Sequence, residues 1–418
     1  MQIDEFKLKV DNKKVRIGVV GLGYVGLNVA CLFAKNGYDV SGYDVSEEKI
    51  ERIKKKNNPI PEEEWLSPVI KDAVGNNFHA SNEMFSEVDV VFVAVPTPMN
   101  DGKIDYSYVT DVFSEVSNIL KPGMMVVLES TVMPGTTGNV LKPILERSGL
   151  KAGKDFWLCM SPERVDPGNR EKFIWNIPKV VGGHDASSTE ALSYLYSKVI
   201  DKVVPVSSPT TAEFVKCMEN VQRDVNIGLT NLFAKLADVA GIDVEEALDA
   251  ASTKFNFMRL KPGCGVGGEC MKEVSQMLMD LGNSKRVDSS LIRSAREVNE
   301  SMPEYTVRKV KEVIGSGRKV GVLGMAYKKD SSSTKNSPAL EIISKLKGLG
   351  FNVKVYDPFV VNCNGISCEK NLADAVKDRD VVVIATDHSV FKKLKLDVPV
   401  VDGRNILPRE GKYCGIGR

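Results

Sequence analysis

The chain has 418 residues, enough for two or three domains, and a hydrophobic content of 43% that can fill their cores. Its 56 basic and 55 acidic residues leave a net charge of +1, so we expect no nucleic-acid partner. No apolar run approaches the roughly 20 residues of a membrane span, and the charged N-terminus lacks the apolar core of a signal peptide. We therefore expect a cytoplasmic protein with no membrane partner, whose first residues form a short leader into a strand. The eight cysteines include no CxxC pair, and no Cys/His cluster has zinc spacing, so we expect no metal.

A glycine-rich turn between a strand and a helix is the first motif along the chain. The elements expected around it are a strand, a helix and a second strand, at residues 15–20, 24–36 and 39–43. Gly21, Gly23 and Gly26 form a G-x-G-x-x-G pattern, which lets the backbone approach a pyrophosphate at the helix N-terminus. Asp44 follows the second strand, where its carboxylate can accept hydrogen bonds from ribose hydroxyls and would repel a 2′-phosphate. The complete unit predicts an NAD-binding domain.

Further strands alternate with helical segments after this unit. They are expected at residues 89–95, 124–130, 155–160 and 178–183. This alternation predicts a parallel, doubly wound sheet, in which ligands bind beyond the carboxyl ends of the strands. The polar segments at such ends are VPTP, ESTVMPGTT and SPERVDPG, at residues 95–98, 129–137 and 161–168. We expect the chemistry to involve these segments.

A long uninterrupted helix is expected over residues 208–240. Ser208 can cap it, Pro209 suits its first position, and Gly241 ends it. At 1.5 Å per residue its roughly 30 residues would span about 45–50 Å. A helix of that length usually crosses a domain boundary or a subunit interface. Shorter helices follow, and Pro303 marks the next boundary, because a new helix restarts there.

A second nucleotide-fold pattern covers residues 318–358. A strand, two glycines, a loop, a helix and a strand ending in Asp357 repeat the plan of the first unit. The glycine pattern is incomplete, because Ala326 and Tyr327 stand where the tight turn would be. The loop over residues 327–337 is long and polar and carries several lysines. This region therefore suits a phosphate-bearing ligand other than the dinucleotide.

Together these patterns predict an α/β protein with two Rossmann-like, doubly wound parallel sheets joined by a central helical domain that contains one long helix. The expected domains are an N-terminal NAD-binding domain, a central helical dimerisation domain and a C-terminal domain, at residues 1–207, 208–302 and 303–418.

The stretch PGCGVGGECM, residues 262–271, places Cys270 in a glycine-rich loop. Beside NAD, a cysteine serves an oxidation that continues from aldehyde to acid, because the thiolate can add to the aldehyde and carry a thioester. Lys216 and Asn220 share one helix face, where the lysine could stabilise an alkoxide or take its proton and the asparagine could hold water or the oxyanion. Glu163 could activate the hydrolytic water, and Thr131 could orient it.

Each of these signals also has a plain structural interpretation. A glycine-rich loop with one cysteine is more often a tight chain crossing than an active site. Lys216 and Asn220 could lie on a solvated helix face, and Glu163 could form a weak surface ion pair with Arg164. Their combination with a complete NAD unit favours the functional interpretation.

The motifs GLGYVGL, VAVPTP, ESTVMPGTT, SPERVDPG, AEFVKCMENVQRDVNIG, PGCGVGGEC, SPALEI and VYDP occur in one order along nearly the whole chain. In this the chain resembles the UDP-glucose/GDP-mannose dehydrogenase family. RDVNI and PGxGVGG are similar to the branch that acts on UDP-N-acetylhexosamines, UDP-ManNAc above all. The resemblance implies an NAD-dependent four-electron oxidation of the sugar C6 hydroxyl to a uronic acid, through cysteine thiohemiacetal and thioester intermediates. It also implies a UDP-binding third domain and a homodimer formed through the helix at residues 208–240.

The resemblance carries over to individual residues. The implied catalytic residues are Cys270, Lys216, Asn220, Glu163 and Thr131. The implied cofactor-binding residues are Gly21, Gly23, Tyr24, Val25, Gly26, Asp44, Pro96, Thr97 and Thr131. The implied substrate-binding residues are Arg164, Lys216, Asn220, Arg223, Asn226, Arg259, Gly263, Gly267, Tyr327, Lys328 and Lys335, with Arg259 reaching the site either within its own subunit or across the dimer.

The chain departs from the family pattern after the nucleophile position. The family places His or Ser before the cysteine and Asp four residues after it, whereas this chain has Glu269 and Val274, with Glu273 one residue early. The loop after Lys329 lacks the usual acidic pair. Three alternatives stay open: a UDP-glucose 6-dehydrogenase, a two-electron dehydrogenase with an idle cysteine, and a non-catalytic nucleotide-sugar-binding paralogue.

Overall fold

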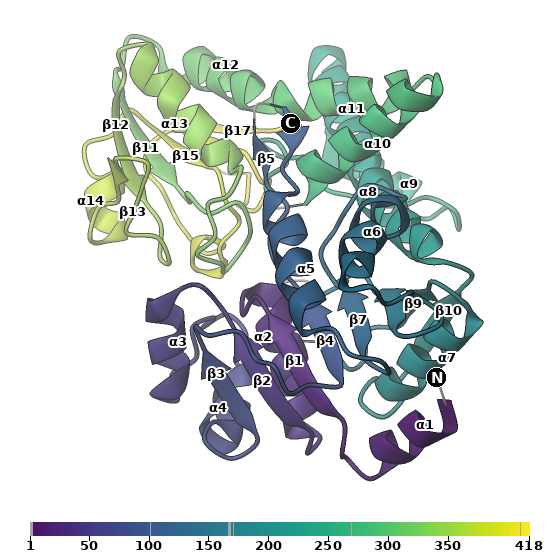
Figure 1. Cartoon of the computed structure of the whole chain (residues 1–418). Coiled ribbons are helices and arrows are strands. Elements are labelled where there is room, and N and C mark those ends of the chain that lie inside the picture. The colour runs from purple at the N-terminus through teal and green to yellow at the C-terminus, as the bar shows by residue number, and fades with distance from the viewer. Residues whose placement is uncertain (1–2, 101, 166–168, 170, 269, 410) are drawn as a thin grey trace. The chain divides into compact units, whose positions relative to one another are not determined.

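A computed structural model describes residues 3–100, 102–165, 169, 171–268, 270–409 and 411–418. The chain divides into two compact units, one of residues 1–219 with 276–281 and the other of residues 220–275 with 282–418. We call them the first and the second unit. Figure 1 traces the elements of both.

In the described part of the first unit, eight strands form one sheet in the order β10-β9-β8-β7-β4-β1-β2-β3 (Figure 1). Their bounds are β1 Arg16–Val20, β2 Asp39–Tyr43, β3 Phe78–Ser81, β4 Val90–Val93, β7 Met125–Leu128, β8 Trp157–Met160, β9 Lys179–Gly183 and β10 Val203–Val206. The order from β3 to β8 is the Rossmann order, whose reversal between β1 and β4 creates a ligand crevice at the carboxyl ends of the strands.

Alternating strand residues bury both faces of this sheet. Val90 and Phe92 pack on one face, whereas Val91 and Val93 pack on the other. The helices of this unit are α1 Ile3–Asp11, α2 Tyr24–Lys35, α3 Glu47–Lys54, α4 Leu66–Ala73, α5 Ser107–Ile119, α6 Lys142–Leu145 and α7 Ala186–Tyr196, with short π and 3₁₀ turns at Thr137–Leu141 and Glu146–Ser148 and a hairpin β5 Met99–Asn100 and β6 Lys103–Ile104. Helices α2, α4 and α7 cover the first face, and α5 and α6 cover the second. The doubly wound fold is therefore confirmed.

Two details differ from the sequence prediction. The N-terminal leader is helix α1, whose Phe6 packs edge-on against Trp157 with ring centroids 5.0 Å apart. Strand β9 runs antiparallel to β8, while the other neighbouring strands of the sheet are parallel. Parallel neighbours need a crossover connection, usually a helix, and the described residues between β8 and β9 contain none.

The second unit contains a five-stranded parallel sheet in the order β12-β11-β15-β16-β17, counted over its described residues. Its strands are β11 Lys319–Leu323, β12 Asn352–Tyr356, β15 Val381–Ile384, β16 Val400–Asp402 and β17 Tyr413–Gly415, with a hairpin β13 Asn362–Cys363 and β14 Ile366–Ser367. Its helices are α9 Val244–Ala251, α11 Ser290–Glu300, α12 Met302–Ile314, α13 Pro338–Gly348 and α14 Leu372–Val376, with a 3₁₀ turn at Ser389–Phe391. This is the 2-1-3-4-5 order of the other common doubly wound fold.

Two helices belong to both units. Helix α8, Pro209–Ala240, runs without a break for 32 residues, as the sequence predicted. Helix α10, Met271–Lys285, contributes residues 276–281 to the first unit. No described helix is long and apolar enough to cross a membrane.

Candidate active site

The glycine turn between β1 and α2 has the geometry of an anion site. Gly21 adopts a φ of +87°, which a residue with a side chain rarely reaches. A Cβ on Gly26 would lie 1.8 Å from the carbonyl oxygen of Gly21, so only glycine allows this close packing. A Cβ on Gly23, the N-cap of α2, would meet no protein atom within 4 Å. The first turn of α2 also lacks an acidic residue, so its N-terminus is open to a phosphate.

A variant at Gly23 can separate a ligand role from a structural one. Gly23 has a φ of −77°, which alanine adopts readily, so Gly23→Ala should change the free energy of unfolding by less than about 0.5 kcal/mol. The added methyl would occupy the space of the pyrophosphate, so we expect NAD affinity to fall at least about tenfold, measured by calorimetric titration. The matched variant Gly26→Ala should lose about 1–3 kcal/mol of stability as well. Unchanged NAD affinity in Gly23→Ala would contradict the assignment.

Asp44 lies at the end of β2 and binds the glycine turn directly. Its Oδ2 accepts a hydrogen bond of 2.8 Å from the amide of Leu22, and its Oδ1 accepts one of 2.9 Å from Ser46. Lys49 on α3 forms an ion pair with the same carboxylate. We did not predict Lys49 from the sequence, although its place in the helix after Asp44 was a usable signal. The pair offers both an acceptor and a donor to vicinal ribose hydroxyls.

The two polar segments after β4 and β7 are tied together. Thr97 donates its hydroxyl to the carbonyl of Thr131 at 2.8 Å, and Ser130 donates to the carbonyl of Val95 at 2.7 Å. Pro96 lies between these contacts. The hydrogen bonds between these two segments therefore hold Thr131 at the carboxyl edge of the sheet, where the Rossmann crevice lies.

Glu163 and Lys216 form a buried pair in the first unit. The Lys216 ammonium donates to the Glu163 carbonyl at 2.7 Å and to its carboxylate at 3.2 Å. Only 7% of the Lys216 side chain and 12% of the Glu163 side chain are exposed, so the solvated-face interpretation of Lys216 does not hold. Arg164 instead donates to the Glu219 carboxylate through Nε and Nη2, and its Nη1 donates to the carbonyl of Pro178 at 2.5 Å.

Helix α8 carries three further candidates into the second unit. Asn220 is buried, Arg223 is exposed, and the Asn226 amide lies 3.7 Å from the sulfur of Met258. Beside them, Asp224 is buried and accepts hydrogen bonds from Arg296, Asn299 and Ser275 at 2.8, 2.9 and 2.7 Å. The sequence analysis missed this network, because its members lie far apart along the chain.

The network extends to the start of the glycine-rich stretch at residues 262–271, which we call the cysteine loop. Asn231 donates to the Asn299 side chain at 2.9 Å and accepts from the backbone amide of Gly263 at 3.0 Å. Arg259 pairs with Glu245 and Asp249 of helix α9 in the same unit. Helix α8 therefore anchors the start of the glycine-rich stretch.

The glycines of the cysteine loop pack against the loop over residues 327–337. A Cβ on Gly267 would lie 2.6 Å from the Cβ of Tyr327 and 2.9 Å from the carbonyl of Asn336. The amide of Gly268 donates to the Lys335 carbonyl at 2.9 Å, and the Asn336 side chain donates to the Gly268 carbonyl at 2.9 Å. The two loops are therefore bound to each other within the second unit.

Cys270 is the N-cap of helix α10 and is half-buried. A helix N-terminus carries partial positive charge, which stabilises an anion such as a thiolate. Cys264, by contrast, is 1% exposed, and burial raises the pKa of its thiol to about 11. The structure thus gives the two cysteines of the loop different surroundings.

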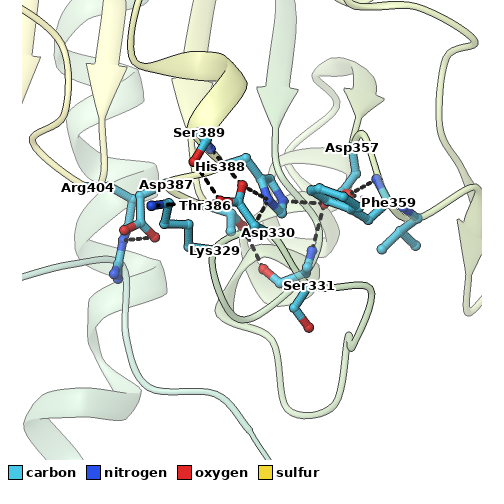
Figure 2. A network of polar contacts seen from close by, with 12 residues as sticks. Lys329, Asp330, Ser331, Asp357, Phe359, Thr386, Asp387, His388, Ser389 and Arg404 are labelled. Carbon is cyan, nitrogen blue, oxygen red and sulfur yellow. Dashed lines mark hydrogen bonds and ion pairs between the residues drawn. The ribbon is translucent and has the colours of Figure 1, made fainter. Parts of the chain in front are cut away.

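The acid of the second nucleotide fold is fully engaged by protein groups (Figure 2). Asp357 accepts hydrogen bonds from the amides of Met325, Ala326, Phe359 and Val360, between 2.6 and 3.0 Å. His388 lies 3.0 Å from the same carboxylate. Burial opposes ionisation of Asp357, but the His388 hydrogen bond and the backbone amides hold its pKa below the usual value. Asp357 therefore has little capacity left for a ribose, unlike Asp44.

His388 also binds the loop over residues 327–337, which we call the lysine loop. Its Nδ1 accepts the backbone amide of Asp330 at 2.9 Å, so Nε2 carries the proton donated to Asp357. Asp330 in turn accepts from the amide and hydroxyl of Ser389 at 2.8 and 2.6 Å (Figure 2). The loop leaves Lys335 exposed and Lys328 partly exposed. No group of metal-ligating side chains occurs among the described residues.

Profiles of three domains match the chain in order. They describe the NAD binding domain, the central domain and the UDP binding domain of the UDP-glucose/GDP-mannose dehydrogenase family, at residues 15–200, 210–301 and 321–409. The chain belongs to this family. The resemblance drawn from the motifs is thereby confirmed, as are the NAD cofactor and the class of NAD-dependent nucleotide-sugar dehydrogenases.

Several members of the family are similar over nearly their whole length. The UDP-N-acetyl-D-mannosamine dehydrogenase of Methanocaldococcus jannaschii is 34% identical over 94% of this chain and 93% of its own. The structure of the UDP-D-ManNAc dehydrogenase of Pyrococcus horikoshii has a TM-score of 0.89 at 34% identity and covers 96% of this chain and 99% of its own. The UDP-glucose dehydrogenase of Pyrobaculum islandicum has a TM-score of 0.88 at 27% identity and covers 96% and 98%.

The departure from the family pattern after Cys270 has a structural consequence. Val274, which stands where the resemblance implied an aspartate, is fully buried. Glu273 is buried as well, and its Oε1 accepts from the Asn336 amide at 3.3 Å. Burial raises the pKa of Glu273. Glu273 thus joins the contact between the two loops, while Glu269 lies outside the described residues.

Proposed function

We propose that the protein oxidises the C6 hydroxyl of a UDP-N-acetylhexosamine, with UDP-ManNAc as the first choice, to the uronic acid. The observation that carries the proposal is the half-buried Cys270 at the N-terminus of α10, in a chain that also has an NAD binding and a UDP binding domain. The similarity to UDP-N-acetyl-D-mannosamine dehydrogenases supports the choice of sugar.

The proposed reaction has four steps at C6. The hydroxyl loses a hydride from carbon and a proton from oxygen, which gives an aldehyde. The Cys270 thiolate then adds to this carbon and forms the C–S bond of a thiohemiacetal, which loses a second hydride and proton to become a thioester. Water adds to the thioester carbonyl and the C–S bond breaks, which gives the carboxylate product, regenerates the Cys270 thiolate and releases two protons. Bound NAD supplies the hydride acceptor, two molecules per sugar.

We assign the accompanying roles to four side chains. Lys216, whose ammonium lies against Glu163, stabilises the negative charge that develops on the C6 oxygen. Asn220 donates to the same oxygen or holds a water. Glu163 takes the proton of the hydrolytic water, and Thr131 orients that water.

The binding roles follow the same assignment. We propose that the glycine turn and Asp44, now with Lys49, hold NAD, and that the lysine loop with Tyr327, Lys328 and Lys335 holds the UDP part. The domain boundaries at residues 207/208 and 302/303 are part of this proposal.

An NADH-release assay over a panel of UDP-sugars tests the function. We expect two NADH per sugar and an acid product, with highest kcat/KM for UDP-ManNAc. One NADH with free aldehyde would instead show a two-electron dehydrogenase. Preference for UDP-glucose would place the protein with its Pyrobaculum islandicum neighbour, and tight binding without turnover would show a non-catalytic paralogue.

We also propose a homodimer formed through helix α8. The helix exposes apolar side chains at a spacing of three or four residues, which is one continuous stripe of a helix. The stripe comprises Leu229, Leu232, Phe233 and Leu236. A stripe of this kind on a soluble monomer would expose apolar area to water, and a second copy can cover it.

Leu236→Glu should therefore convert the dimer to a monomer, because it places a charge in the proposed interface. Leu236 is exposed in the single chain, so the substitution should leave the fold of the monomer intact. Size-exclusion chromatography with light scattering measures the mass. Leu8→Glu on α1, also an exposed leucine on a helix, should leave the dimer intact. A Leu236→Glu protein that remains dimeric would exclude this interface.

A further inference from the structure

A small cavity lies beside the Glu163 carboxylate in the first unit. Its volume of about 10 Å³ is the space of roughly one water molecule. Its wall consists of Val25, Val29, Glu129, Glu163, Arg164, Val165, Ile174, Ile177 and Lys179. The Oε1 atom of Glu163 is fully buried and has no hydrogen-bond partner among the described residues, whereas Oε2 is bound by Lys216. Within the part of the chain that the structure describes, one carboxylate oxygen of the proposed base therefore lacks a protein donor.

A second carboxylate forms part of the same wall. Glu129, at the end of β7, is completely buried, and its two oxygens are bound by the Tyr196 hydroxyl and the Lys179 ammonium. Lys179 also donates to the carbonyls of Ser161 and Pro162 at 3.2 Å each, just before Glu163. Burial raises the pKa of Glu129, and the nearby charge of Glu163 adds to the effect. The reaction proposed above uses none of these three side chains.

A buried carboxylate oxygen without a donor costs about 1–3 kcal/mol or more. Apolar cavities of proteins stay dry, but a cavity with polar groups on its wall can hold a water that makes two to four hydrogen bonds. This cavity has carboxylates on its wall together with Lys179 and Arg164. A water molecule can donate one hydrogen to each of two carboxylates.

We propose that an ordered water in this cavity donates to Glu163 Oε1 and to Glu129, and that Glu129 is a positioning residue for Glu163. The water and Lys216 together fix both oxygens of the Glu163 carboxylate. Apart from residues 166–168 and 170, which the structure does not describe, the cations that face this arrangement are Lys179, Arg164 and Lys216. The inference rests on the proposed function only in the role it gives Glu163 during thioester hydrolysis.

A crystal structure of the full chain that resolves ordered water tests the site directly. We expect a water within hydrogen-bond distance of both carboxylates. Val29→Ile adds one methylene to the apolar wall, so the same site should be dry in that variant. A wild-type cavity without water overturns the inference. This readout needs no turnover, so it decides the inference even if every UDP-sugar fails as a substrate.

The pH dependence of acid formation tests the positioning role. Glu129→Gln leaves the Lys179 charge uncompensated. The midpoint of the acidic limb of the rate profile should therefore shift to a pH lower by about one unit. Val29→Ile removes the water that solvates Glu163, so the limb should move up. A purely structural role would lower the rate without opposite shifts. Glu213→Gln, at a buried carboxylate that binds the amides of Gly135 and Thr137 and does not line the cavity, should not move the limb. An unmoved limb in both cavity variants overturns the role.

Discussion

Cys270→Ala should abolish uronic acid formation, with a loss of at least about 10³-fold, because the proposed reaction carries the thioester on the Cys270 thiol. Mass spectrometry of the product measures this loss. NAD affinity should stay within about twofold, since the NAD binding domain is matched at residues 15–200 and Cys270 lies outside it. Acid formation near the wild-type rate would refute the nucleophile assignment.

The neighbouring cysteine provides the control for this variant. Cys264 lies in the same loop, but its Sγ is buried 3.4 Å from the carbonyl of Gly403. Cys264→Ala should cost about 1 kcal/mol of stability through lost packing and still produce acid. The pair of variants therefore distinguishes a reactive thiol from a packed one.

Asp224→Ala should lower the free energy of unfolding by about 3–5 kcal/mol. The Arg296 guanidinium beside it is only 8% exposed, and removal of the carboxylate leaves this buried charge with the half-exposed Glu300 as its remaining ion-pair partner among the described residues. Ser275 and Asn299 would lose acceptors in the same step. Urea denaturation measures the change as a shift of the midpoint.

Asp249→Ala is the matched control for Asp224→Ala. Asp249 also pairs with an arginine, Arg259, but its side chain is 69% exposed. A solvated pair of this kind contributes about 0–1 kcal/mol. Equal losses in the two variants would contradict a burial-dependent role for Asp224.

The elements that the sequence predicted correctly are those with local causes. Gly21, Gly23 and Gly26 determine the first turn through backbone geometry within six residues, and helix α8 follows from 32 residues without a breaker. The roles of Glu163, Lys216 and Cys270 remain predictions, although the structure brings the first two into contact.

The features that the sequence did not reveal depend on distant partners. Asp224 meets Arg296 across 72 residues, and His388 meets Asp357 across 31. Nothing in the local pattern of either residue indicates which group it will bind. The docking of helix α1 likewise depends on Trp157, and the reversal of β9 depends on a connection without a crossover helix. Such contacts become visible only when the chain is folded.

The hydrogen bonds that join Gly268 to Lys335 and Asn336 connect the loop that carries the proposed nucleophile to the loop that we propose for the UDP part. Through these bonds, a ligand that moves the lysine loop can also move Gly268, two residues before Cys270. The free energy of binding the diphosphate of the substrate can thus help to place the Cys270 thiol in its reactive position. A free hexosamine, which lacks the UDP part, would then react slowly even at a saturating concentration. The enzyme would then discriminate between substrates through the position of the Cys270 thiol as well as through affinity for the sugar.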